Sequence, residues 1–366
     1  MKLLMITQKI DRDDDILGVY HEWAREISKS FDKLSVICLY KGRNELPRGI
    51  EVFSLGKEIN NFQFLVNFQS IFNFKIFKKP KYIWLFYRYI WQERKNYDAV
   101  FVHMNPVYVL MGWPMWKILN KKICLWFAHP AWNRQVKLAY ILSDKVITSV
   151  PEAFRKRGGK VHAIGQGIDT ELFENTGFGD GTKSSILSLG RISPSKNIHI
   201  LIEALRGLKE SGVLFTFTLV GSAPQMPGAA EYDRKIKDMI MDFDMADASE
   251  LRGAGPYGET VNWYNKSEVF VNLSPIGHFD KTVLEAMASG CITLASNDAY
   301  YNIFPQDLHG LLIFKQGDAD DLAQKLKKVL ELPEDKKDEI RERLRDVVVK
   351  NHSIYTLGER VSSIVS

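Results

Sequence analysis

The chain has 366 residues, of which 45% are hydrophobic and 25% charged, and its formal net charge at pH 7 is +5. These values exclude an intrinsically disordered chain and predict a globular protein of two domains. The charge is modest and no nucleic-acid-binding motif accompanies it, so we do not expect nucleic acid as a partner. Its cysteines, Cys38, Cys124 and Cys291, are far apart, which indicates buried thiols in a reducing compartment.

The amino-terminal half alternates strand-like and helical patterns. Buried strands are predicted at 2–6, 34–39, 99–103, 123–128 and 145–148, with helices between most of them. This alternation predicts an α/β fold with a parallel, doubly wound sheet, whose ligands gather at the carboxyl ends of the strands. The first apolar run is too short for a signal peptide, and no segment holds ~18 uninterrupted apolar residues. We therefore expect a cytoplasmic protein.

Several residues of this half lie at expected strand ends. Gly18 falls between the first strand and a helix, where it serves either a turn or the close approach of a phosphate or sugar. His129 follows the strand 122–128, so its ring should project from the carboxyl edge of the sheet; a structural histidine is the alternative. His103 ends another strand ahead of Asn105, and both are weaker candidates for a ligand contact at this edge.

Asp13 and Asp15 form an Asp-x-Asp pair, a pattern of carboxylates that can bind a divalent metal. Here the pair lies in the first loop, far in sequence from the phosphate-binding candidates described below. We expect a solvated loop or an acceptor contact there, and no metal.

The segment 72–91 mixes lysines and arginines with many aromatic residues. One interpretation is a helix that packs on the sheet and leaves its basic residues in solvent. The other is docking of 72–95 on an anionic membrane surface, where rings enter the headgroup layer and cations meet lipid phosphates.

A second alternating set begins after the glycine-rich stretch 174–182, which we predict to be a linker. The strand 186–189 ends in Gly190, and Arg191 and Lys196 precede a periodic helix over 198–208. A guanidinium and an ammonium at such a corner suit phosphate oxygens. A solvated helix start is the alternative interpretation.

The most informative stretch is 274–290, a loop of small residues that leads into a helix. Backbone N–H groups and the helix dipole make the start of such a helix a binding site for a diphosphate. Glu285 lies one turn into this helix, within reach of a bound ribose.

Together these segments resemble the group 1 glycosyltransferases, retaining nucleotide-sugar enzymes that include sucrose synthase, bacterial glycogen synthase and phosphatidylinositol mannosyltransferase. The resemblance is strongest over 161–297, where 164–169 is similar to the hinge segment of the family and 284–290 to its signature helix. It implies the GT-B architecture, two doubly wound Rossmann-like domains that face each other across a cleft. We expect an acceptor-side domain at 1–173, the linker at 174–182, a nucleotide-sugar domain at 183–351, and a last helix, 352–366, packed back on the first domain.

The resemblance also implies functions for individual residues. Arg191, Lys196 and His129 would take part in catalysis, with the two cations neutralising the departing diphosphate and no cofactor or metal required. The residues expected to hold the nucleotide-sugar donor are Gly18, Gly190, Gly221, His278, Phe279, Asp280, Lys281, Thr282 and Glu285. His103 and Asn105 are the acceptor candidates.

One position departs from the family pattern. The family usually has two glutamates eight positions apart, the first contacting the donor sugar and the second the ribose, but position 277 is glycine and only Glu285 remains. We hypothesise that Asp280 takes over the contact with the sugar.

The expected function is retaining transfer of a sugar, a hexose by family habit, from a nucleotide diphosphate sugar to an acceptor hydroxyl. No strong side-chain base is evident, and the family is thought to use front-face attack, in which the departing phosphate receives the acceptor proton. A cell-surface polysaccharide or a glycolipid intermediate is the expected acceptor, with the protein peripheral on the inner face of the plasma membrane. The alternatives are a nucleotide-sugar epimerase of the same architecture and a catalytically degenerate nucleotide-sugar-binding protein.

Overall fold

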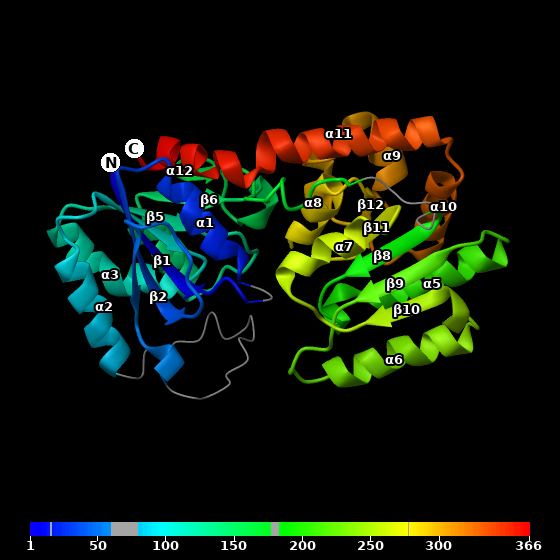
Figure 1. Cartoon of the computed structure of the whole chain (residues 1–366), viewed down its shortest axis with the longest axis horizontal. Coiled ribbons are helices and arrows are strands. Elements are labelled where there is room, and N and C mark those ends of the chain that lie inside the picture. The colour runs from blue at the N-terminus through cyan, green and yellow to red at the C-terminus, as the bar shows by residue number, and fades with distance from the viewer. Residues whose placement is uncertain (15–16, 60–79, 177–182, 277) are drawn as a thin grey trace. The chain divides into compact units, whose positions relative to one another are not determined.

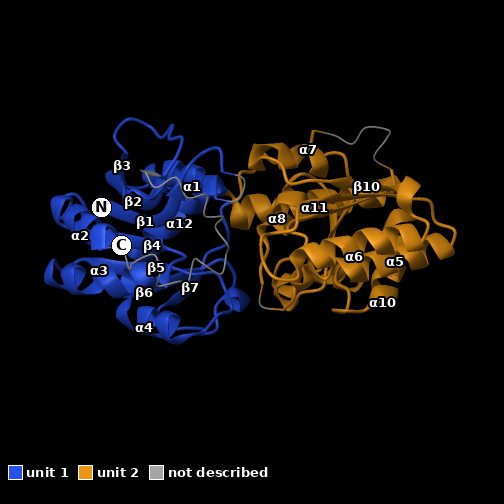
Figure 2. Ribbon diagram, turned by 90° about the horizontal axis from the view of Figure 1, so that it is seen from below, with its two compact units in different colours: residues 1–167, 354–366 blue, residues 168–353 orange. Residues whose placement is uncertain are grey.

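The structure is a computed structural model, and its described residues are 1–14, 17–59, 80–176, 183–276 and 278–366. They form two compact units, one of Met1–Gly167 with Ile354–Ser366 and the other of Ile168–Ser353 (Figure 2). The chain thus enters the second unit after Gly167. The predicted linker lies within that unit, and its residues 177–182 are outside the described ranges.

Among the described residues of the first unit, seven parallel strands form a sheet in the order β3-β2-β1-β4-β5-β6-β7 (Figure 1). The strands are β1 (Lys2–Ile10), β2 (Lys33–Lys41), β3 (Glu51–Ser54), β4 (Ala99–His103), β5 (Lys122–Trp126), β6 (Lys145–Thr148) and β7 (Val161–Ala163). Strand order reverses between β1 and β4, which is the mark of a doubly wound sheet. The predicted fold class is confirmed.

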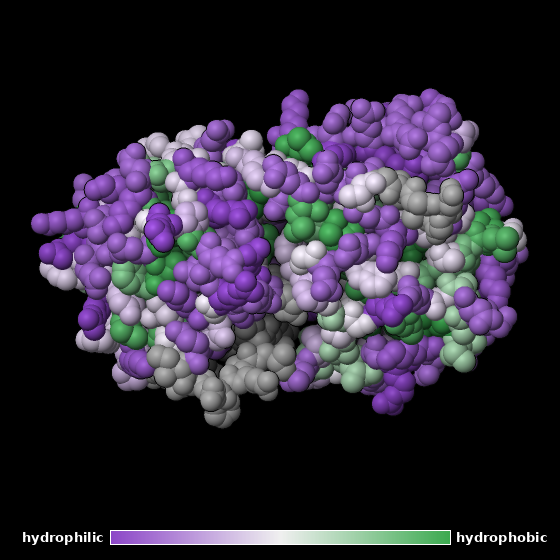
Figure 3. Space-filling view, in the orientation of Figure 1, coloured by the Kyte–Doolittle hydropathy of each residue, from purple (hydrophilic) through white to green (hydrophobic). Residues whose placement is uncertain are grey.

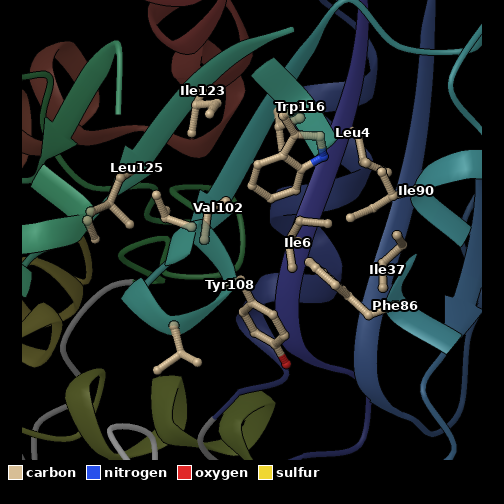
Figure 4. Close-up of a cluster of buried hydrophobic side chains, with 14 of the residues drawn as sticks. Leu4, Ile6, Ile37, Phe86, Ile90, Val102, Tyr108, Trp116, Ile123 and Leu125 are labelled. Atoms are coloured by element: carbon tan, nitrogen blue, oxygen red, sulfur yellow. The ribbon is translucent and has the colours of Figure 1, made fainter. Parts of the chain in front are cut away.

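Helices cover both faces of this sheet. They are α1 (Val19–Ser28), α2 (Pro80–Gln92), α3 (Pro106–Ile118), α4 (Arg134–Leu142) and α12 (Leu357–Val365). Buried residues of α2, α3 and α4 share one core with strand residues such as Leu4 and Ile6, and Figure 4 shows Phe86 and Trp116 of this core. Leu3 and Met5 alternate with these strand residues and therefore face the side that α1 covers.

The last helix belongs to the first unit. α12 packs against α1, and a Cβ at Gly358 would lie 2.5 Å from Ser30 Oγ, so the two helices approach closely. Arg360 donates to the carbonyl oxygens of Ile164 and Gln166. These hydrogen bonds hold the segment that comes just before the chain leaves the first unit at Gly167.

The described residues of the second unit contain a five-stranded parallel sheet in the order β10-β9-β8-β11-β12. Its strands are β8 (Ser185–Leu189), β9 (Thr216–Val220), β10 (Ser249–Arg252), β11 (Val269–Asn272) and β12 (Ile292–Ala295). The helices are α5 (Ile198–Glu210), α6 (Ala229–Asp242), α7 (Thr260–Tyr264), α8 (Lys281–Ala288), α9 (His309–Leu312), α10 (Ala319–Leu330) and α11 (Glu334–His352). This unit is also doubly wound, because the order reverses between β8 and β11.

The cysteines lie inside these two cores. Cys38, Cys124 and Cys291 are buried free thiols, and burial raises the pKa of each. Across the described ranges, no helix is both long and apolar enough to cross a membrane.

Candidate functional site

The predicted phosphate corner lies at the carboxyl ends of two neighbouring strands in the second unit. β8 ends at Leu189, just before Gly190, and β11 ends at Asn272 and leads through a loop into α8. In doubly wound sheets, ligands bind at this edge, and here it coincides with the reversal of strand order. The two segments predicted from distant parts of the sequence therefore meet at one edge.

Lys196 and Asp280 form an ion pair that joins these segments. The Lys196 ammonium donates to Asp280 Oδ2 and, at 2.9 Å, to Ser274 Oγ. The same carboxylate oxygen accepts from Ser274 Oγ and, at 3.1 Å, from Asn272 Nδ2. Burial alone would raise the pKa of Asp280, but Lys196 and these hydrogen bonds outweigh it and lower the pKa to about 2. The carboxylate therefore stays charged and compensates the lysine.

The first turn of α8 adds further groups that suit an anion. Asp280 is the N-cap residue, yet its side chain makes no capping hydrogen bond, because its carboxylate turns to Lys196. Thr282 Oγ1 and Lys281 Nζ are buried and have no hydrogen-bond partner among the described residues. Lys281 Nζ lies 3.6 Å from a Glu285 oxygen. Together with the helix N–H groups, these donors could bind a diphosphate.

Asn297 fixes the loop before α8. Its Nδ2 donates to the carbonyl oxygens of Pro275 at 2.6 Å and His278 at 2.7 Å. His278 itself is exposed, while the next ring, Phe279, packs 5.5 Å from the ring of Tyr300. The loop therefore has a buried polar anchor at its base and leaves His278 accessible.

Glu285 is buried and makes contacts with two tyrosines. Its Oε1 accepts from Tyr257 Oη at 3.0 Å, and its Oε2 accepts from Tyr264 Oη at 3.1 Å. Burial, followed by the negative charge of Glu285, raises the pKa of Tyr264 well above its usual value. Tyr257 is only half-buried, so this hydroxyl is the partner of Glu285 that a ribose hydroxyl could most readily replace.

Two glycines shape the edge of the sheet beside this cluster. Gly190 has φ of +147° and Gly221 has φ of +149°, a backbone conformation in which any residue with a side chain would be strained. A Cβ on Gly221 would lie 1.8 Å from the carbonyl oxygen of Gly190, whereas a Cβ on Gly190 would have no described atom within 4 Å. The space in front of Gly190 is thus open, and Arg191 beside it is exposed.

Residues 170–347 match the sequence model of a family described as glycosyl transferases group 1. The second domain belongs to the group 1 glycosyltransferases. The family resemblance of the sequence is confirmed.

Relatives with named biological contexts match about half of the chain. WcaL of Escherichia coli K12, named for colanic acid biosynthesis, is 26% identical over 191 residues, which are 50% of this chain and 45% of WcaL. AmsK of Erwinia amylovora, an amylovoran biosynthesis glycosyltransferase, is 27% identical over 173 residues, which are 45% of this chain and 40% of AmsK. The matched part thus spans less than half the length of either relative.

Solved structures resemble the whole chain. Anabaena HepE, crystallised with UDP and glucose, has a TM-score of 0.72 at 17% identity and aligns over 99% of this chain and 98% of HepE. Sucrose-phosphate synthase of Thermosynechococcus elongatus has a TM-score of 0.75 at 15% identity, over 100% and 98% of the two chains. At such identities the likeness establishes the fold, which is GT-B.

In the group 1 domain, the departure from the family pattern lies at Gly277, which is outside the described residues. Asp280, our candidate for the sugar contact, is bound to Lys196, Ser274 and Asn272 through one carboxylate oxygen. Its function toward the sugar stays a prediction, and any such contact has to coexist with, or replace, the pair with Lys196.

His129 lies in the first domain, three residues after the end of β5, and is half-buried. Its Nδ1 accepts from the backbone N–H of Ala131 at 3.0 Å, and its ring centre lies 6.2 Å from that of Phe127. In a neutral ring this contact places the proton on Nε2. The catalytic function of His129 stays a prediction.

His103 and Asn105, the acceptor candidates, both have structural contacts. His103 is buried, its Nδ1 lies 3.3 Å from Thr7 Oγ1, and its ring centre lies 4.1 Å from that of Tyr20. Burial lowers the pKa of His103 to about 3, so the ring is neutral. Asn105 is the N-cap of α3 and accepts from the N–H of Val107 at 3.1 Å. Neither side chain offers an acceptor an exposed polar group.

Gly18 lies where predicted, as the N-cap residue of α1, with φ of −55°. A Cβ there would lie 2.5 Å from the carbonyl oxygen of Asp14, so the packing of the turn already requires a glycine. In the same loop, Asp13 lies 3.5 Å from Arg43, whereas Asp15 is outside the described residues. No group of three or more His, Cys, Asp or Glu side chains in the described ranges is arranged to hold a metal.

Sequence reasoning gave no function to several residues of the site: Asn272, Ser274, Tyr257, Tyr264 and Asn297. Asn272 and Ser274 could have been predicted, since polar residues at the end of a buried strand mark a ligand-binding edge. Asn297 likewise follows β12 by two residues. Nothing in the local pattern marks the tyrosines, because their contact with Glu285 depends on the fold of the whole domain.

Proposed function

We propose that the protein is a glycosyltransferase that moves a sugar from a nucleotide diphosphate sugar to an acceptor hydroxyl, with retention at the anomeric carbon. The observation that carries the proposal is the contact of Lys196 with Asp280 and Ser274 at the start of α8, in a domain of the group 1 family. The proposal of retention is supported by the family resemblance. HepE, of the same fold, was crystallised with UDP and glucose, in keeping with a nucleotide-sugar donor.

The donor diphosphate would bind between the Lys196 corner and the first turn of α8. Lys196 and Arg191 would then neutralise the charge that develops on the leaving phosphate, together with the helix N–H groups. The N–H groups at the start of α8 are held in place by the helix before the reaction, so they need little reorganisation at the transition state. We assign no metal ion to this step and no side-chain base; the departing phosphate would receive the proton of the acceptor hydroxyl.

Binding would require Lys196 to change partners. In this structure its charge is compensated by Asp280, and a diphosphate would offer a second and larger negative charge. Asp280 would then be released toward the sugar or share the ammonium with the phosphate. Either arrangement makes Asp280 sensitive to the presence of donor, which provides a test developed in the Discussion.

We further propose that the acceptor is a cell-surface polysaccharide or glycolipid intermediate. WcaL and AmsK, which match about half of this chain, are named for the synthesis of colanic acid and amylovoran. The transferred sugar would be a hexose, as in most of the family.

The first experiment is a thermal-shift screen against UDP, GDP, ADP and their common sugar conjugates. A ligand that binds the folded state raises the unfolding temperature by mass action. Lys196→Ala and Arg191→Ala should abolish the shift, whereas the control Arg206→Ala, an exposed arginine on α5, should preserve it. No shift with any nucleotide would refute the proposed site.

An assay of turnover with a nucleotide sugar, with and without acceptor, then distinguishes a transferase from an epimerase and from a binding protein. Release of nucleotide diphosphate that depends on an added acceptor supports transfer. Conversion of the donor to another sugar without acceptor would instead identify an epimerase. Binding without either reaction, across a panel of lipid-linked and polysaccharide acceptors, would identify a nucleotide-sugar-binding protein.

A further inference from the structure

One face of α2 lies in solvent although it is rich in tryptophan. The helix buries Tyr82, Phe86 and Ile90 in the core, at a spacing of four residues. The opposite side exposes a stripe that we call the α2 stripe: Lys81, Trp84, Arg88 and Trp91. Trp84 is 59% exposed and Trp91 52% exposed. Large apolar side chains that are exposed close together mark a surface that binds a membrane or another protein.

The neighbouring helices extend this surface with aliphatic residues. Ile118 at the end of α3 is 83% exposed, and Leu138 and Ile141 on α4 are also exposed. α2, α3 and α4 pack on the same core, and Tyr87 Oη donates to the carbonyl oxygen of Met111 at 2.7 Å, which joins α2 to α3. In Figure 3, hydrophobic side chains interrupt the hydrophilic surface over the region where Figure 1 shows α2 and α3.

The charge on these helices is of one sign. None of α2, α3 and α4 contains an aspartate or a glutamate. Their basic residues are Lys81, Arg88, Lys117, Arg134 and Lys137. By contrast, α1 and α12 contain Glu22, Glu26 and Glu359. The absence of acids is therefore a property of the α2 side of the sheet.

Of the nearest acids, one is buried and the other pairs with Lys117, so Lys81, Arg88, Arg134 and Lys137 carry the remaining charge. Glu93, just after α2, is buried and accepts from Ser35 Oγ at 3.0 Å. Asp144, just after α4, accepts from Lys117 Nζ at 2.7 Å. The face formed by α2, α3 and α4 thus presents exposed apolar side chains among positive charges.

We propose that the outer faces of α2, α3 and α4 dock on an anionic lipid bilayer. Tryptophan rings are most stable at the boundary between headgroups and acyl chains, and lysine and arginine meet the phosphates beside it. Protein interfaces are also rich in tryptophan and arginine, but they are depleted in lysine, which supplies three of the five cations on these helices. Five cations without an acid therefore favour an anionic lipid surface. At 13 residues, α2 is far shorter than the ~20 that span a bilayer, so it lies on the surface.

The proposal goes beyond donor binding and concerns residues distant in sequence from Lys196 and Glu285. If the proposed function holds, the docking surface also names the acceptor class, because a protein held on a bilayer meets lipid-linked acceptors there. Failure of one proposal does not entail failure of the other. The nucleotide thermal shift tests the site, and vesicle binding tests the surface.

The test is sedimentation of the full-length protein with phosphatidylcholine vesicles, with and without phosphatidylglycerol, at low and high salt. We expect binding only to the anionic vesicles, weakened by salt. Lys81→Ser with Arg88→Ser should lower the partition constant about 25-fold, since each cation near an anionic surface contributes about fivefold. Trp84→Ser with Trp91→Ser should lower it at least about tenfold, because two rings leave the interface.

Matched controls come from the second unit. Arg206→Ser with Lys209→Ser removes the same charge, and Met241→Ser with Leu214→Ser removes two exposed apolar side chains. Both controls should bind as the wild type does. The proposal is overturned if the wild type does not sediment with anionic vesicles, or if the control variants lose as much binding as the α2 variants.

A second measurement locates the rings directly. Bromine-labelled acyl chains quench tryptophan fluorescence only at short range, so vesicles that carry them should quench the wild type. Trp84→Phe with Trp91→Phe should lower that quenching strongly, with partly buried Trp113 of α3 as a remaining source, and should leave the nucleotide thermal shift unchanged. Loss of a dimer in these variants, with vesicle binding intact, would assign the face to a second copy of the chain and refute the lipid proposal.

Discussion

Replacing Asp280 with asparagine tests the ion pair on which the candidate site depends. The amide resembles the protonated carboxyl group, so it removes the charge while retaining an oxygen for Ser274 and Asn272. The pKa of Asp280 is lowered from 3.8 to about 2, and one pKa unit corresponds to 1.36 kcal/mol. Asp280→Asn should therefore lower the free energy of unfolding at pH 7 by about 2 kcal/mol.

The pH dependence follows from the sign of the shift. A carboxyl group whose pKa is lower in the folded state stabilises the fold above its unfolded pKa of 3.8 and loses this effect as the pH falls toward about 2. The gap between wild type and variant should thus be full at pH 7 and smaller at about pH 3. Native-state hydrogen exchange of the β11 and α8 amides measures it within the second unit. A variant as stable as the wild type, or a gap that ignores pH, would refute the reasoning.

The same variant separates two functions of Asp280. If the carboxylate only compensates Lys196, then Asp280→Asn frees the ammonium and should strengthen binding of UDP and UDP-sugar alike. If it contacts the sugar, binding of UDP-sugar should weaken relative to UDP. Calorimetric titration with both ligands distinguishes these outcomes, and equal unchanged affinities would remove Asp280 from the donor site altogether.

Other substitutions test the framework. Gly221→Ala sets a Cβ 1.8 Å from the carbonyl oxygen of Gly190 and should cost at least about 1–3 kcal/mol in urea denaturation; Gly190→Ala, at a similar φ with open space, should cost less. Tyr264→Phe removes a 3.1 Å hydrogen bond to the buried Glu285 carboxylate and should cost about 1.5–3 kcal/mol, so an unchanged melting temperature would contradict it. Because the pKa of His103 falls from 6.5 to about 3, stability should fall below pH 6.5 by about 1.4 kcal/mol per pH unit, and His103→Gln should flatten that slope.

The sequence predicted the central strands better than the edges of the sheets. The expected strands at 99–103 and 145–148 match β4 and β6 in their bounds. Strands buried on both faces read as continuous apolar runs, so their limits are visible in the sequence. β3, β7, β10 and β12 had no predicted counterpart, and all four lie at sheet edges. β3, β7 and β10 are short and partly exposed, so their sequences resemble loops, whereas β12 is buried but only four residues long.

The positions of the site residues could be predicted from the sequence, but the contacts between them could not. Lys196 and the α8 start could be recognised because strand-to-helix corners have local signatures. The partner of Lys196 lies 84 residues away, and Tyr257 lies 28 residues before Glu285. Such pairs are set by the order of strands in the sheet, which brings β8 beside β11. No short segment of the sequence specifies this order of strands.

The missing glutamate and the paired aspartate together suggest how the donor site balances its charge. With glycine at 277, Asp280 is the only acid in the loop between β11 and α8, and it is bound to the cation that faces the same edge. Lys281 lies 3.6 Å from a Glu285 oxygen, so the positive end of the α8 dipole remains as a contribution that neither carboxylate offsets. The start of α8 therefore attracts a diphosphate even while the Lys196–Asp280 pair is intact. We infer that the pair restrains the corner in the free protein without blocking the donor, so Lys196 can transfer to the phosphate only when a stronger anion is already bound beside it.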